Sequence, residues 1–99
     1  IAVLGEMLEL GRWAEPLHRE VGKYVASQGI DVLVGIRGVA RSLVDAAIEG
    51  GLPTNAALFF AEPGDAGAHL KTMARSGDAI LFKGSRGTHV ERALERYLG

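Results

Sequence analysis

The chain has 99 residues, which is enough for one compact domain and too few for two. Its 11 Lys and Arg side chains are offset by 12 Asp and Glu, which argues against a general nucleic-acid surface, because such a surface needs clustered excess cations. There is no cysteine, so disulfides and thiolate metal sites are excluded, and no apolar run approaches the ~20 residues that span a bilayer.

Four short apolar runs alternate with four amphipathic stretches along the chain. The runs are continuous, which is typical of strands buried on both faces of a parallel sheet. Each amphipathic stretch has apolar residues at helical spacing, and three of the four stop at a glycine. The predicted strands are residues 1–4, 32–36, 57–60 and 79–82, and the predicted helices lie around residues 17–25, 40–48, 66–74 and 90–98.

The alternation of strand and helix predicts a Rossmann-like, three-layer α/β domain with a mostly parallel open sheet. This pattern leaves the order of the strands within the sheet undetermined. Thr88 followed by Glu91 predicts a capping box at the start of the last helix.

In open α/β sheets, ligands bind beyond the carboxyl ends of the strands, and four loops occupy that edge here. The last loop, residues 83–89, runs from a strand into a helix N-terminus, which favours an anion. Lys83 adds a point charge, Ser85 a hydroxyl, and Arg86 a guanidinium that can grip a carboxylate through two hydrogen bonds. The alternative interpretation is an ordinary capped turn whose cations are solvated.

Two other loops carry charged candidates at the same edge. Glu6 and Glu9 lie between two glycines and could orient an amine, whereas Arg37 could bind a carboxylate. All three could equally be surface charges. His18 and His69 lie within predicted helices without metal-ligand spacing, so we expect surface or half-buried structural roles for them.

Two glycine-rich phosphate-binding patterns are missing from the sequence. The dinucleotide pattern Gly-x-Gly-x-x-Gly does not follow the first strand, and the triphosphate pattern Gly-x-x-x-x-Gly-Lys-Ser/Thr does not occur. The chain therefore lacks the usual means of holding a triphosphate alone.

Two segments carry a resemblance to a known family. Residues 1–11 (IAVLGEMLELG), continued by residues 15–22, and residues 77–87 (GDAILFKGSRG) are similar to an early and the final strand–loop unit of the C-terminal domain of Mur ligases. The similarity is greatest to the members that add D-alanyl-D-alanine to UDP-N-acetylmuramoyl-tripeptide. It spans nearly the whole chain and is weakest in the middle third. Glu6 departs from the usual aspartate of the family, and Ala14 from a serine-type cap.

The resemblance implies that residues 1–99 are the C-terminal domain of a cytoplasmic, three-domain ligase of peptidoglycan synthesis. It also implies that the domain's first strand and helix, the central ATPase domain and the UDP-binding domain lie outside this chain. The complete enzyme would use ATP and Mg²⁺ to form an acyl phosphate, which the dipeptide amine attacks. The chain alone would bind neither cofactor and would be inactive.

Within that ligase, the resemblance implies that this domain positions D-alanyl-D-alanine and excludes water. The carboxylate would meet Lys83, Ser85 and Arg86, and the amine Glu6 or Glu9. No residue here need be a covalent nucleophile. Two alternatives remain open: another amino-acid ligase of the Mur superfamily, and a stand-alone binding module of flavodoxin-like shape.

Overall fold

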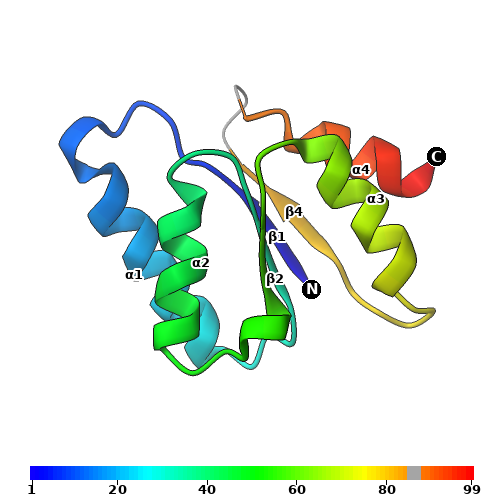
Figure 1. Ribbon diagram of the computed structural model, residues 1–99, viewed down its shortest axis with the longest axis horizontal. Helices are drawn as coiled ribbons and strands as arrows, with labels where there is room; N and C mark the ends of the chain where they lie inside the picture. Colours follow the sequence, from blue (N-terminus) through cyan, green and yellow to red (C-terminus); the bar gives the residue numbers. More distant parts are fainter. Residues whose placement is uncertain (85–87) are drawn as a thin grey trace.

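The computed structural model describes residues 1–84 and 88–99 and has four parallel strands in one sheet (Figure 1). The strands are β1 (Ala2–Gly5), β2 (Leu33–Ile36), β3 (Ala57–Phe60) and β4 (Leu81–Lys83), in the spatial order β3-β2-β1-β4. The predicted parallel α/β fold is therefore confirmed. The order places the first strand inside the sheet, so the chain builds outward to β3 and then crosses over to β4.

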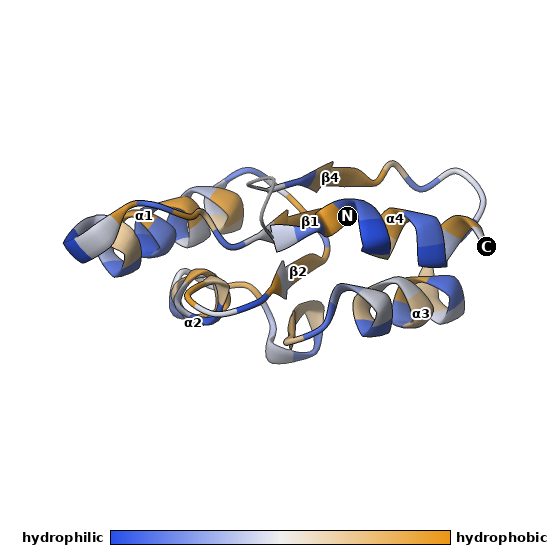
Figure 2. Cartoon of the chain, turned by 90° about the horizontal axis from the view of Figure 1, so that it is seen from above, coloured by the Kyte–Doolittle hydropathy of each residue, from blue (hydrophilic) through white to orange (hydrophobic). Residues whose placement is uncertain are grey.

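Four helices cover the two faces of the sheet as two pairs (Figure 2). The first pair is α1 (Ala14–Ser27), entered through a 3₁₀ turn at Gly11–Trp13, and α2 (Ala40–Glu49). The second pair is α3 (Pro63–Met73), whose proline suits the first turn of a helix, and α4 (Val90–Leu98). Another 3₁₀ turn, Thr54–Ala56, leads into β3.

Strand pairing sorts the side chains of the sheet onto its two faces. Ala2 of β1 is in register with Leu33 of β2 and Leu81 of β4, and these residues share the face of α1 and α2. Val3 and its neighbours face α3 and α4. One hydrophobic core therefore lies on each side, the first around Leu33, Leu43 and Val25 and the second around Val34, Ile36 and Leu70.

Glycine allows the helices of each pair to approach closely. A Cβ at Gly22 of α1 would collide with the backbone carbonyl of Leu43 in α2. A Cβ at Gly67 of α3 would likewise collide with the carbonyl of Ala93 in α4. Each pair is therefore packed backbone against backbone, with no room for a side chain at the crossing.

The helix pair α1–α2 leaves part of its face of the sheet uncovered. Leu81 of β4 has 58% of its surface exposed, although Leu33 in the same register is completely buried. The helix α2 lies over β2 and β3, so it shields Leu33 but not the β4 end of the sheet.

The predicted capping box at α4 is wrong. The residue before α4 is His89, which adopts the left-handed conformation with φ of 58° and makes no side-chain cap. Thr88 is buried, and its hydroxyl donates to the backbone carbonyl of Glu6 at 2.6 Å. The hydroxyl thus links two loops, and this hydrogen bond satisfies a polar group that is buried.

Candidate functional site

The carboxyl ends of the four strands bring four loops to one edge of the domain (Figure 1). All strands run in the same direction, so each loop leaves the sheet on the same side. The candidate residues Lys83, Glu6, Glu9 and Arg37 all belong to these loops or to the strand end before them. Ser85 and Arg86 lie outside the described residues, so their candidate roles stay predictions.

Glu6 joins three of the loops. Its backbone N–H donates to Ile36 at 2.9 Å, and its carbonyl accepts from the Thr88 hydroxyl. Its carboxylate accepts a 2.9 Å hydrogen bond from the backbone N–H of Val39, the residue before α2. A carboxylate at a helix N-terminus is favoured by the helix dipole. The carboxylate of Glu6 is therefore a structural brace for the neighbouring loop.

The loop after β2 is held in an unusual conformation beside this carboxylate. Arg37 and Gly38 both have positive φ, of 68° and 46°. A Cβ on Gly38 would collide with the carboxylate of Glu6, which would have to move from its position beside Val39, and the positive φ also favours glycine. The loop is thus shaped jointly by its own glycine and by Glu6.

Arg37 is partly engaged within the protein. Its guanidinium lies 3.7 Å from the carboxylate of Glu62 in the loop after β3, and its backbone N–H donates to Phe60. The Arg37 side chain is 28% exposed and that of Glu62 is 69% exposed, so the pair is weak and solvated. Arg37 could therefore exchange this partner for a carboxylate of a ligand.

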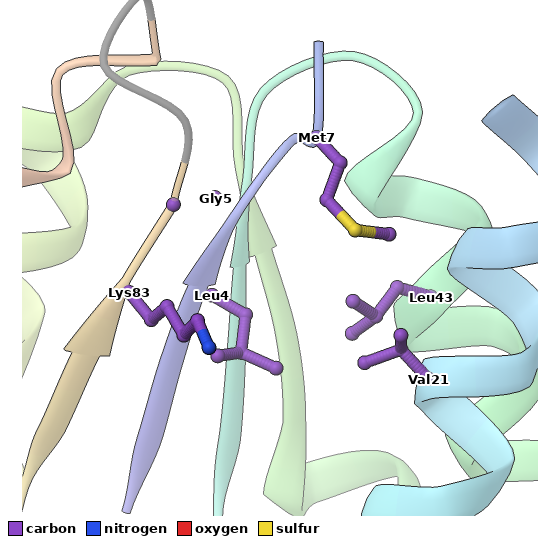
Figure 3. A pocket seen from close by; sticks show the side chains of 7 residues that line it. Leu4, Gly5, Met7, Val21, Leu43 and Lys83 are labelled. Atoms are coloured by element: carbon purple, nitrogen blue, oxygen red, sulfur yellow. The ribbon is translucent and has the colours of Figure 1, made fainter. Parts of the chain in front are cut away.

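Lys83 points away from the helix that follows its strand. It is in register with Leu4 of β1, which places its side chain on the face of α1 and α2, whereas α4 packs on the other face. Figure 3 shows the side chain extending over Leu4, with its ammonium directed into a pocket. Sequence reasoning grouped Lys83 with the start of α4, but strand alternation separates the two.

This pocket has a volume of about 350 Å³ and a predominantly apolar lining. It opens between the ends of β1 and β4 and the helices α1 and α2 (Figure 3). Its lining consists of Leu4, Gly5, Met7, Val21, Leu43, Lys83 and Gly84. Within the described ranges, no carboxylate lies within salt-bridge distance of the Lys83 ammonium. An apolar cavity with one cation suits a small molecule that has an anionic group and aliphatic parts.

Glu9 is exposed and adopts the left-handed conformation, with φ of 63°. Since a non-glycine residue rarely adopts this conformation, the loop after β1 is held by contacts elsewhere in it. The carboxylate of Glu9 therefore stands at the protein surface, where it can meet a cation.

His89, at the end of the last loop, forms a hydrogen-bonded pair with Glu91 of α4. The Nδ1 atom of His89 lies 3.0 Å from a carboxylate oxygen of Glu91. This hydrogen bond, with a backbone hydrogen bond at Glu91, holds the pKa of the Glu91 carboxyl below its usual range. The pair places an ionised carboxylate at the start of α4.

His18 is fully buried, which the sequence did not predict. Its Nε2 atom accepts a 2.9 Å hydrogen bond from the backbone N–H of Met7, and its Nδ1 atom lies 2.6 Å from the carbonyl of Ala14. Helical spacing places residue 18 on α1 but does not report what lies against it. Sequence reasoning likewise missed Glu62 as the partner of Arg37, because their contact joins two different loops.

The part of the chain that the structure describes has neither a membrane-spanning helix nor a cluster of metal ligands. Over residues 1–84 and 88–99, no helix is long and apolar enough to cross a membrane. The same residues include no group of three His, Asp or Glu side chains that could hold a metal ion.

The fold defines a class: a doubly wound α/β domain, in which ligands generally bind beyond the carboxyl ends of the strands. A family model described as "Mur ligase, glutamate ligase domain" matches residues 1–86, and the chain belongs to this family. The family resemblance seen in the sequence is thereby confirmed.

Relatives within the family share nearly the whole chain. The UDP-N-acetylmuramoyl-tripeptide–D-alanyl-D-alanine ligase of Bacillus subtilis (strain 168) is 31% identical over 94% of this chain and 20% of its own length. The ligase of the same name from Synechocystis sp. is 32% identical over 99% of this chain and 21% of its own length. The chain therefore spans about a fifth of the relatives it matches.

Solved structures agree with the sequence comparison. The MurF ligase of Thermotoga maritima, described in complex with ADP, superposes with a TM-score of 0.76 at 28% identity, over 97% of this chain and 21% of that chain. MurF from Acinetobacter baumannii superposes with a TM-score of 0.79 at 25% identity, over 99% of this chain and 22% of that one.

Proposed function

We propose that the chain is the C-terminal domain of a ligase that joins D-alanyl-D-alanine to UDP-N-acetylmuramoyl-tripeptide. The observation that carries the proposal is the similarity, over nearly all of this chain, to two ligases with that name. The location of Lys83 supports it, because a cation at the mouth of an apolar pocket suits a small peptide carboxylate.

The domain would act by positioning the incoming dipeptide. Lys83 would attract the carboxylate, and the apolar lining would accept the two methyl groups of the dipeptide. Ser85 and Arg86 are proposed to complete the carboxylate site, and Glu9 to attract the amine. Glu6 is proposed to shape the amine side of the site, since one of its carboxylate oxygens accepts from Val39. Arg37 is proposed as a second contact for a carboxylate.

ATP and Mg²⁺ are proposed to bind outside this chain. The ADP named with the Thermotoga maritima ligase supports nucleotide use by the complete enzyme. The described residues here offer no group that fits a metal ion, so we assign the nucleotide and its metal to other domains. The complete ligase is proposed to work in the cytoplasm, where its nucleotide substrates are made.

The test is ATP-dependent ligation by the complete ligase that carries this chain. Phosphate release should require both UDP-N-acetylmuramoyl-tripeptide and D-alanyl-D-alanine, and the amide product should be visible by mass spectrometry. The 99-residue chain alone should give no product. Ligation by the isolated chain would show that the domain assignment is wrong.

A second candidate function has one observation in its favour. The matching family model is described as a glutamate ligase domain, and glutamate is a single amino acid, not a dipeptide. A panel of D-glutamate, L-amino acids, diamino acids and dipeptides distinguishes the two functions. Product formation with a single amino acid, and none with D-alanyl-D-alanine, would favour the second.

A further inference from the structure

The imidazole of His18 is bound to the protein through both ring nitrogens. It has no exposed surface, and its two partners are the backbone N–H of Met7 and the backbone carbonyl of Ala14. Burying a polar group costs free energy unless the group is hydrogen-bonded. A buried imidazole therefore needs a partner for each ring nitrogen, and His18 has both.

The two partners determine the tautomer of the ring. A backbone N–H can only donate, so Nε2 must accept and carries no proton. A backbone carbonyl can only accept, so Nδ1 must carry the proton. The ring is therefore neutral in the Nδ1–H form, and a proton on Nε2 would face the Met7 N–H directly.

The bond to Met7 reaches the loop that forms one side of the pocket. Met7 follows β1, and in Figure 3 its side chain lies toward Leu43 and Val21 across the cavity. His18 is in the second turn of α1, and its own Nδ1 is tied to the first turn through Ala14. The ring thus connects the start of α1 to the wall of the pocket.

We propose that His18 is a positioning residue, whose Nδ1–H tautomer fixes the backbone of Met7 and with it the apolar wall opposite Lys83. The identity of the ligand in the pocket rests on the proposed function. The hydrogen bonds of His18 do not depend on that function. His18 itself does not contact the substrate in this proposal, and it acts through Met7.

The first test is nuclear magnetic resonance of the 99-residue chain labelled with ¹⁵N. The Nε2 resonance of His18 should have the shift of an unprotonated imidazole nitrogen, and Nδ1 that of a protonated one. A scalar coupling across the hydrogen bond should connect the Met7 amide nitrogen to His18 Nε2. A protonated Nε2, or a missing coupling, would overturn the proposal without any variant having to fold.

The second test compares two amide replacements. His18→Gln places an oxygen near the position of Nε2 and can still accept from Met7, whereas the shorter His18→Asn reaches only the position of Nδ1. Hydrogen exchange at the Met7 amide should be close to wild type in His18→Gln and about three- to tenfold faster in His18→Asn. Equal exchange in both variants would contradict the proposal.

In the complete ligase, His18→Asn should raise KM for the dipeptide by about three- to tenfold while kcat changes little, and His18→Gln should restore KM. An unchanged KM in His18→Asn, or a KM that His18→Gln fails to restore, would refute positioning by this bond. If the ligase rejected D-alanyl-D-alanine, the proposed function would fail, yet the nuclear magnetic resonance and exchange results would still decide the role of His18.

Discussion

The carboxylate of Glu6 accepts a 2.9 Å hydrogen bond from the backbone N–H of Val39, which lies 33 residues further along the chain. This contact ties the loop after β1 to the loop that leads into α2. Because the same carboxylate fills the space over Gly38, the two loops depend on each other for their shape.

Removing the Glu6 carboxylate should destabilise the domain. The size of this loss should depend on whether residue 38 is glycine or alanine. Glu6→Ala leaves the Val39 N–H without its partner and should lower the free energy of unfolding by about 1–3 kcal/mol. Gly38→Ala should also destabilise, because its Cβ meets the carboxylate and its φ is positive. In the double variant the methyl group at position 38 no longer collides with a carboxylate. The loss in free energy of unfolding, measured by urea denaturation, should therefore be smaller than the sum of the losses in the two single variants. Strict additivity would contradict the steric coupling.

Much of the fold could be predicted from the sequence. Four strand–helix units, their order and their parallel direction follow from continuous apolar runs and from helical spacing, which are local signals. The strand order could not be predicted, since the pairing of β1 with β4 joins residues nearly 80 positions apart and depends on packing of the whole domain.

The candidate site was predicted less completely. Strand direction predicts that the candidate residues share one edge of the sheet, and Lys83, Glu9 and Arg37 do lie there. The partners of these residues could not be predicted, because contacts such as Arg37 with Glu62 form between loops. Thr88 gave a false capping signal because α4 begins one residue later than that pattern requires, which makes His89 the residue before the helix. The face occupied by Lys83 could have been found from strand alternation with Phe82.

Replacing Gly22, at the crossing of α1 and α2, should strongly destabilise the domain. Gly22→Ala puts a methyl group into the backbone carbonyl of Leu43, which cannot move without separating the helices, so we expect a loss of about 2 kcal/mol or more. Gly64→Ala in α3 is the matched control, because no atom lies within 4 Å of its Cβ. It should be neutral or stabilise by up to about 1 kcal/mol. Thermal unfolding of both variants measures the contrast, and equal effects would argue against the tight crossing.

Lys83 should matter for binding of the acceptor and little for stability. In the complete ligase, Lys83→Met should raise KM for the dipeptide by about 10- to 100-fold, because a charge-assisted hydrogen bond to a carboxylate is lost. Lys71→Met, on α3 on the opposite face of the sheet, serves as the control and should leave KM unchanged. Steady-state phosphate release measures both. A normal KM in Lys83→Met would remove this lysine from the site.

The titration of Glu91 should depend on His89. The hydrogen bond from His89 lowers the pKa of the Glu91 carboxyl, so His89→Ala should raise that pKa toward its ordinary value. A lowered pKa in the folded state contributes stability above the ordinary carboxyl pKa, and this contribution is lost as the pH falls through the lowered value. Carbon-13 titration of the Glu91 carboxyl tests the shift, and the same titration in both proteins would refute the pairing.

The parallel sheet also places the candidate groups and the connecting turns at opposite ends of the domain. The candidate groups gather where the strands finish, while the turns around Gln28 and Gly77 join elements at the other end. A fluorophore or an affinity handle attached at either of these turns would lie at the opposite end of the sheet from the candidate groups. Such a label would leave the loops after β1, β2 and β3 unmodified, so binding of a candidate ligand could be measured in the labelled protein.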